Sequence, residues 1–213
     1  NAALYAAASE RFTAAAPEIT PAPRRSETGE SSAELPEEAP AETAPIAVDF
    51  AALRQESPDV IAWLYCEDTP IDYPVVQGRD NRYYLHRSYD GAYSAAGSIF
   101  ADAANRADFQ DANTILYGHH MRDGSMFAGL EKWRDPAYFE AHPVMWLLTP
   151  EGDYRIELIA GYTTRAGAEV YTVFSEGGPE LEAYLRRALE QSDFDSGAEI
   201  DPNERYIVLS TCS

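Results

Sequence analysis

Residues 206–213, YIVLSTCS, form an apolar run that ends in a cysteine. A short β-branched run of this kind is typical of a buried strand. Strand geometry would then place Cys212 at the rim of a sheet. The other interpretation is an inert cysteine, because a free cysteine packs like a small hydrophobic residue. The stretch therefore predicts a β fold, and Cys212 is a candidate nucleophile.

Similar short runs occur along most of the chain before this one. Turn signals separate them, including Asp90-Gly91, Asp123-Gly124 and a hairpin turn at residues 151–153. Many short strands with few helices predict a mainly β barrel or sandwich with helices attached. The other predicted strands are residues 63–66 (WLYC), 71–76 (IDYPVV), 97–100 (GSIF), 114–118 (TILYG), 144–149 (VMWLLT) and 154–163 (YRIELIAGYT).

A few helix signals accompany these strands. Asp49 is placed to cap a helix that turns Phe50 and Leu53 inward, and Ser57-Pro58 resembles a second helix start. Residues 179–191, PELEAYLRRALEQ, predict an amphipathic helix. Its apolar face would carry Leu181, Tyr184, Leu185, Ala188 and Leu189. A shorter helix is expected from Ser125, with Phe127, Leu130 and Trp133 at helical spacing, and Asp135-Pro136 is expected to cap a short turn.

Composition excludes some classes of function. The formal net charge is -20, which repels nucleic-acid phosphates and anionic lipid headgroups. No basic stripe is present, so nucleic-acid binding is not expected. Two cysteines are too few for a disulfide framework. No run of about 18 apolar residues occurs, so no membrane helix is expected within the chain.

The N-terminal part differs in composition from the rest. Residues 3–16 are rich in alanine and compatible with a helix, and residues 17–45 are rich in Pro, Glu, Ser and Thr. Such a segment buries too little apolar surface to fold alone. We expect residues 1–47 to be a largely disordered linker or tail and residues 48–213 to be the folded domain.

His119 is a candidate for the acid–base residue that a nucleophilic cysteine requires. It ends a predicted strand in the stretch LYGHHM, after Gly118, which would allow a tight turn. Neighbouring side chains on a strand point to opposite faces, so only one of His119 and His120 could reach a site. A thiolate attacks a carbonyl and an imidazole supplies the proton that the leaving amine gains. Two histidines with no further ligand at suitable spacing make a weak case for zinc, and His86 and His142 are interpreted as structural.

Four stretches together resemble the class B sortases, a family of cysteine transpeptidases. They are residues 69–91 (TPIDYPVVQGRDNRYYLHRSYDG), 97–102 (GSIFAD), 113–143 (beginning NTILYGHHMRDGSMF) and 206–212 (YIVLSTC). The resemblance runs from about Phe50 to Ser213. YGHHMRDGSMF and LSTC match the family's signatures around its catalytic histidine and cysteine, and IDYPVVQGRDNRYYL indicates class B.

The resemblance implies a closed sortase-type β-barrel with N-terminal helices and a helix between the sixth and seventh strands. It implies that Cys212 is the nucleophile and His119 the catalytic histidine. Positions that line the peptide groove in the family match Asn81, Leu85, Tyr117, Ser210 and Thr211. No metal or other cofactor is expected.

The implied reaction is transpeptidation on the extracellular face of the membrane of a Gram-positive bacterium. A C-terminal sorting motif of a secreted protein is cut after its Thr through a thioacyl-enzyme, and an amine of a cell-wall precursor or a pilin resolves it. An N-terminal anchor outside this chain would supply the membrane contact. The alternatives are a hydrolytic cysteine peptidase and a catalytically impaired peptide-binding or pilus-assembly module.

One expected element has no counterpart in the sequence. The family's catalytic arginine lies on the strand after the cysteine, so the chain is expected to hold seven of eight strands and to lack that arginine. Arg122, Arg155 and Arg165 do not match its position. The explanations are a truncated sequence, a lost tail or a degenerate protein. Cys66 is interpreted as a packed core thiol.

Overall fold

The computed structural model describes residues 2–16, 43–165 and 169–212, with the side chain of Cys212 not described. The α-helices are α1 (Ala2–Phe12), α2 (Phe50–Glu56), α3 (Pro136–Ala141) and α4 (Pro179–Gln191), and 3-10 helices span Tyr83–His86, Phe127–Arg134 and Glu169–Tyr171. The strands are β1 (Thr13–Ala15), β2 (Ile46–Val48), β3 (Val60–Tyr65), β4 (Asp72–Val76), β5 (Ile99–Ala101), β6 (Asn113–His119), β7 (Val144–Thr149), β8 (Gly152–Glu157) and β9 (Tyr206–Cys212).

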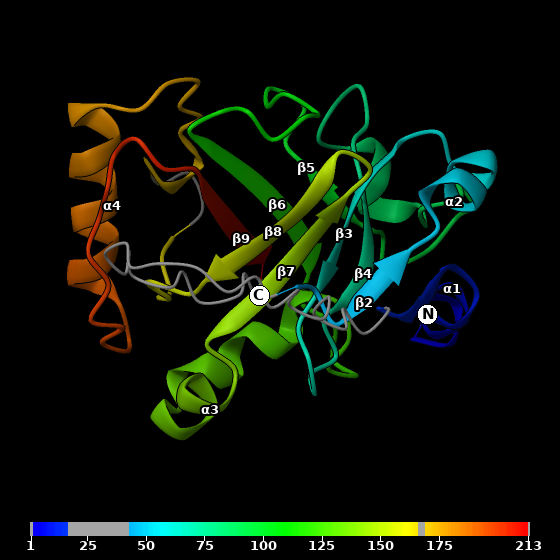
Figure 1. Ribbon diagram of the computed structural model, residues 1–213, viewed down its shortest axis with the longest axis horizontal. Coiled ribbons are helices and arrows are strands. Elements are labelled where there is room, and N and C mark those ends of the chain that lie inside the picture. Colours follow the sequence, from blue (N-terminus) through cyan, green and yellow to red (C-terminus); the bar gives the residue numbers. More distant parts are fainter. Residues whose placement is uncertain (1, 17–42, 166–168, 213) are drawn as a thin grey trace, which may run out of the picture.

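A curled, mixed sheet dominates the molecule (Figure 1). Its seven strands lie in the order β8-β7-β3-β4-β5-β6-β9, and β8 and β9 are the edges among the described residues. The pairs β4–β5 and β6–β9 are parallel and the others antiparallel. Helix α4 lies between β8 and β9 along the chain, which are the sixth and seventh strands of this sheet. The predictions of a mainly β fold and of a helix at this place are confirmed.

Local signals explain several helix starts. The Asp49 side chain accepts a hydrogen bond from Ala52 N at 2.9 Å, and the Asp135 side chain accepts one from Ala137 N at 3.0 Å. Each therefore satisfies an amide that has no partner inside its helix. Pro179 begins α4, whose inner face buries Leu181, Tyr184 and Leu185. The apolar face that sequence predicts is thus the face that packs.

The predicted helix start at Ser57-Pro58 is wrong. Ser57 instead ends α2, because its N–H donates to Leu53 O and its hydroxyl donates to Tyr89 O. Strand β3 then begins at Val60, three residues before the predicted start at Trp63. Proline suits the first turn of a helix, but it suits a turn between elements equally well.

The predicted strand over residues 154–163 is too long, because β8 ends at Glu157. Ile159 packs instead against the cluster that includes Leu181 and Tyr184 of α4. Ile159 therefore contacts the helix cluster while Leu158 packs against the main core, and neither continues the strand.

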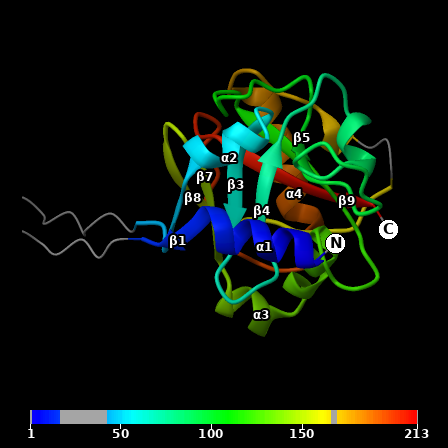
Figure 2. The ribbon, with the colours of Figure 1, turned by 90° about the vertical axis from the view of Figure 1, so that its right-hand side faces the viewer.

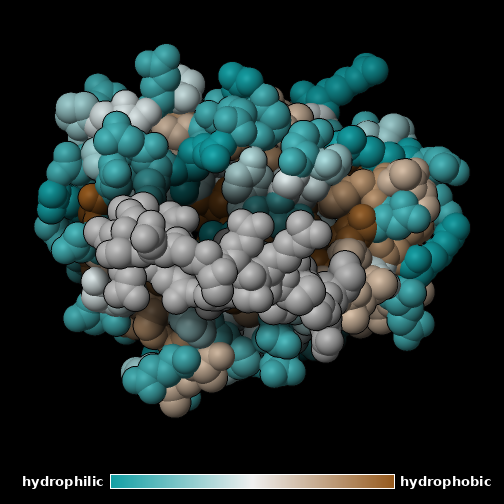
Figure 3. Space-filling model, in the orientation of Figure 1, coloured by the Kyte–Doolittle hydropathy of each residue, from teal (hydrophilic) through white to brown (hydrophobic). Residues whose placement is uncertain are grey.

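Helix α1 packs against the sheet and contacts β4 (Figure 2). Tyr5, Ala8 and Phe12 are buried in the same cluster as the core of the sheet, and the Tyr5 hydroxyl donates to Gly97 O at 2.5 Å. β1 pairs with β2, which ties the helix to the chain before α2. Figure 3 shows apolar surface in tan on the right of the molecule, the side on which Figure 1 places α1, although Glu10 and Arg11 of this helix are also exposed. The predicted domain boundary near residue 48 stays a prediction, and residues 17–42 of the predicted linker lie outside the described residues.

Cys66 is a buried free thiol, and its Sγ donates to Val144 O at 3.4 Å. Burial raises the pKa of this thiol, because an apolar surrounding disfavours the thiolate. Its prediction as a packed core residue is confirmed.

Candidate active site

Strands β6 and β9 run parallel, side by side, and end together (Figure 1). Their register pairs Tyr117 with Ser210 and His119 with Cys212. Paired strands lie about 4.8 Å apart. Two residues far apart in the sequence therefore meet at the same end of the sheet, as their strand-end positions predict.

The ring of His119 is held in place by the 3-10 helix Tyr83–His86. Its Nε2 lies 2.7 Å from Leu85 O, and a carbonyl oxygen can only accept, so Nε2 carries the hydrogen. In the neutral ring the lone pair is then on Nδ1. The half-exposed ring also stacks on His86, with 5.8 Å between centroids. These contacts set both the orientation and the tautomer of the imidazole.

His120 points away from this arrangement. Its Nε2 lies 3.1 Å from Glu131 Oε1 on the 3-10 helix Phe127–Arg134. The two neighbouring histidines therefore contact different elements, as the alternation of side chains along a strand predicts.

Gly118 allows close packing on the opposite face of β6. A Cβ at this position would lie 2.6 Å from Ile99 Cδ1 and 2.7 Å from the ring of Phe127. Gly118 lies within the strand, paired with Thr211, so the predicted tight turn is the wrong reason for this glycine. The absent side chain lets β6 approach the buried Phe127.

Gly118→Ala should therefore destabilise the fold. Because Ile99 and Phe127 are both buried, the added methyl group overpacks the core, which costs about 2 kcal/mol. Urea unfolding followed by fluorescence measures this loss. Gly129→Ala is the matched control, because its Cβ would meet nothing within 4 Å. Equal stability of both variants would contradict this role of Gly118.

Two of the predicted peptide-binding residues meet at Asp102, just after β5. Asp102 Oδ2 accepts hydrogen bonds from Asn81 Nδ2 at 2.9 Å and from the Tyr117 hydroxyl at 2.7 Å. We call Asn81, Asp102 and Tyr117 the Asp102 cluster. Tyr117 lies two residues before His119 on β6, so the two side chains share a face of the sheet.

Tyr171 connects the cluster to β9. Its ring lies 6.0 Å from that of Tyr117, and its hydroxyl oxygen accepts a hydrogen bond from Ser210 Oγ at 3.3 Å. Thr211, in contrast, is paired with Gly118, and its buried Oγ1 has no hydrogen-bond partner among the described residues. Four of the predicted residues, Asn81, Leu85, Tyr117 and Ser210, are thus linked to the end of β6 and β9 by contacts.

Sequence reasoning missed Asp102 and Tyr171. Asp102 ends the stretch GSIFAD, but a single aspartate carries no local signal of its partners. Tyr171 lies in a 3-10 helix between β8 and α4, and it reaches β9 only through the tertiary fold.

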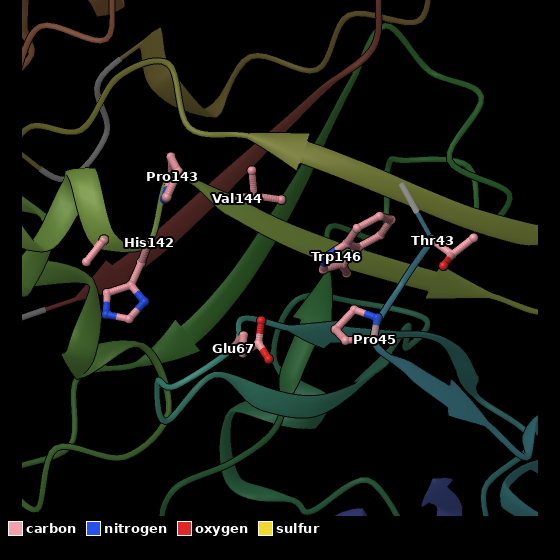
Figure 4. A pocket seen from close by; sticks show the side chains of 8 residues that line it. Thr43, Pro45, Glu67, His142, Pro143, Val144 and Trp146 are labelled. Carbon is pink, nitrogen blue, oxygen red and sulfur yellow. The ribbon is translucent and has the colours of Figure 1, made fainter. Parts of the chain in front are cut away.

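A pocket elsewhere contains none of the predicted site residues (Figure 4). It has a volume of about 390 Å³ and opens where the chain before β2, the turn after β3 and the start of β7 come together. Its lining residues are Thr43, Pro45, Glu67, Ala141, His142, Pro143, Val144 and Trp146. This pocket is separate from the His119–Cys212 pair.

Metal-ligating side chains are not grouped in the part of the chain that the structure describes. No three His, Cys, Asp or Glu side chains there could share an ion. None of the described helices combines the length and the apolar character needed to cross a membrane. Of the arginines considered above, Arg155 lies on β8 and bonds Glu157.

Comparison with known proteins gives one consistent result, although no protein-family model matches the chain. Sortase B of Listeria monocytogenes is 42% identical over 161 residues, which are 75% of this chain and 65% of that protein. Sortase B of B. anthracis, solved in complex with AAEK1, is 36% identical, with a TM-score of 0.72 and 77% of each chain covered. The Staphylococcus aureus sortase B–substrate complex is 29% identical, with a TM-score of 0.74, and 77% of this chain and 76% of that chain are covered.

Proposed function

Since this chain belongs to the sortase B family, we propose that it is a cysteine transpeptidase that joins secreted proteins to an amine. The chain spans 65% of the length of the Listeria monocytogenes relative, so the activity is inferred from the site. The observation that carries the proposal is the register of β6 and β9, which pairs His119 with Cys212.

Two steps make up the proposed reaction. In the first, His119 takes the proton of the Cys212 thiol, the resulting thiolate attacks the carbonyl carbon of a Thr in the sorting motif, and His119 passes that proton to the amine that leaves. The product is a thioester between Cys212 and the Thr. In the second step, a primary amine attacks this thioester and loses its proton to His119, and the Cys212 sulfur leaves as thiolate. A new amide bond, between the Thr and the acceptor amine, thus replaces the peptide bond that was cut after the Thr.

The surrounding residues support a peptide substrate. Asn81, Tyr117 and Ser210 offer polar side chains, and Leu85 supplies the carbonyl that orients His119. We propose that these residues and Thr211 contact the sorting motif. The Staphylococcus aureus neighbour is a sortase B–substrate complex, which supports the binding of a substrate by a protein of this family.

We assign the acceptor to the class of primary amines, from a cell-wall precursor or a pilin. A further sortase B structure is complexed with triglycine, a short peptide with a free amine. The expected location is the outer face of the cell membrane of a Gram-positive bacterium, as implied by relatives from Listeria monocytogenes and Staphylococcus aureus.

An added amine should therefore redirect the products. We expect this protein, mixed with an Asn-Pro-x-Thr-type peptide and triglycine, to give peptide ligated to triglycine after the Thr. Mass spectrometry of the products measures it. N-acetyl-triglycine is the control, because its capped amine cannot attack the thioester. If only hydrolysed peptide forms at saturating triglycine, the protein is a hydrolytic cysteine peptidase and the transpeptidase proposal fails.

A further inference from the structure

Asp102 is a nearly buried carboxylate at the centre of the Asp102 cluster, and the residue is 8% exposed. Its backbone is fixed first: Asp102 N donates to Ile115 O at 2.9 Å, and Asp102 O accepts from Gln77 Nε2 at 2.8 Å. Its Oδ1 accepts from Ala104 N at 2.8 Å, which fixes the rotation of the carboxylate. The remaining oxygen, Oδ2, accepts from two side chains, Asn81 and Tyr117.

Asn81 and Tyr117 come to this oxygen from separate parts of the chain. Asn81 is exposed on the segment between β4 and the 3-10 helix Tyr83–His86, whereas Tyr117 lies on β6. Asn81 is held at both ends of its amide, because its Oδ1 also accepts from Ala103 N at 2.7 Å. The amide therefore has a defined orientation despite its exposed position.

The chemistry of this contact explains why an aspartate is present. A buried carboxylate is costly unless donors satisfy it, and hydrogen bonds to a charged acceptor are stronger than those between neutral groups. Ala104 N, Asn81 Nδ2 and the Tyr117 hydroxyl supply three donors. These bonds also fix the side chains of Asn81 and Tyr117 before any peptide binds. Peptide binding therefore does not carry the entropic cost of ordering them.

We propose that Asp102 is a positioning residue for peptide binding, which acts by holding Asn81 and Tyr117 in one arrangement beside the His119–Cys212 pair. The inference rests on the proposed function, because it assigns the Asp102 cluster to the binding of the sorting motif. It makes Asp102 act through other residues, without contact to the reacting atoms.

The test uses the Asp102→Asn variant. If Oδ1 keeps its bond to Ala104 N, the new NH₂ group replaces Oδ2 and meets the Asn81 amide as donor against donor. We expect KM for the peptide to rise about tenfold, which corresponds to one lost hydrogen bond to a charged group. The value of kcat should change less than about twofold, because the His119–Cys212 pair is untouched. A fall in kcat at unchanged KM would overturn the proposal.

Asp111→Asn is the matched control for a purely structural effect. Asp111 is 3% exposed, and its Oδ2 accepts from Asn105 Nδ2 at 2.9 Å and Arg106 N at 2.7 Å, on the same loop. We expect KM for Asp111→Asn to stay at the wild-type value when measured well below its unfolding temperature. An equal rise in KM for both variants would show that Asp102 matters only for the fold.

A double-mutant cycle tests the link to Asn81. In an Asn81→Ala background, Asp102→Asn should raise KM much less than in the wild type, because the held side chain is already gone. If the double variant raises KM by the product of the two single-variant increases, Asp102 does not act through Asn81.

A spectroscopic readout separates this inference from the proposed function. In ¹⁵N NMR spectra, the Asn81 side-chain amide should show two well-separated proton signals in the wild type and in Asp111→Asn. In Asp102→Asn these signals should move together towards random-coil values. If the wild type cuts no sorting peptide while the signals change as stated, the proposed function and the assignment to peptide binding fail, whereas the hold of Asp102 on the Asn81 amide stands. Unchanged Asn81 signals would overturn the positioning role.

Discussion

Cys212→Ala should abolish cleavage of a sorting-motif peptide while peptide binding is retained. Alanine lacks the thiol, so no thioester can form, and no other nucleophile is paired with His119 in β9. The backbone pairing of β6 and β9 does not need the sulfur, so the binding residues should keep their places. Peptide cleavage followed by HPLC gives the loss, and fluorescence anisotropy of a labelled peptide gives the dissociation constant.

Cys66→Ala is the control for this experiment. Cys66 is buried in the core, and burial raises the pKa of its thiol, so the thiolate is disfavoured there. We expect Cys66→Ala to keep cleavage within about twofold of the wild type, with some loss of stability from the smaller side chain. Cleavage by Cys212→Ala that disappears only when Cys66 is also replaced would move the nucleophile to Cys66 and contradict the account.

His119→Gln should lower kcat/KM by about 10³-fold. The glutamine amide can still donate to Leu85 O, but it cannot take up or release a proton in the reaction. Loss of a general acid–base typically costs 10²–10⁴-fold, which sets this expectation. Initial rates at several peptide concentrations measure the effect.

His120→Gln is the neighbouring control. His120 faces Glu131 on the other side of β6, so its replacement should change kcat/KM less than about twofold. Equal losses of kcat/KM in the two variants would mean that catalysis depends on the packing at the end of β6 and not on the His119 imidazole. A wild-type kcat/KM for His119→Gln would exclude His119 from catalysis.

Local chemistry is what made much of the fold predictable. Asp49 and Asp135 cap helices because their side chains accept from amides two or three residues away, and these contacts are contained in the sequence itself. The long amphipathic helix and most strands follow from the spacing of apolar residues. The helix start predicted at Ser57-Pro58 was wrong because a serine before a proline suits both a helix start and a turn. Only the contact of Ser57 with Tyr89 decides between the two.

The candidate site was predictable only in part, for a related reason. Cys212 and His119 stand at strand ends in recognisable stretches, and the register of β6 and β9 brings them together. Asp102 and Tyr171 act through contacts with Asn81, Tyr117 and Ser210, which come from other elements. Such long-range hydrogen bonds leave no spacing pattern in the sequence. Gly118 was noticed for backbone freedom, whereas its role is to leave room for Phe127.

The central claim is that Cys212 forms a thioester with the Thr of a cleaved sorting motif. Intact-mass measurement of the protein after mixing with an Asn-Pro-x-Thr-type peptide, beside Cys212→Ala, tests it most directly. We predict an added mass equal to the peptide cut after its Thr, on the wild type only, which disappears when triglycine is added. An adduct of the same mass on Cys212→Ala, or peptide cleavage by the wild type with the adduct on another residue, would contradict the account.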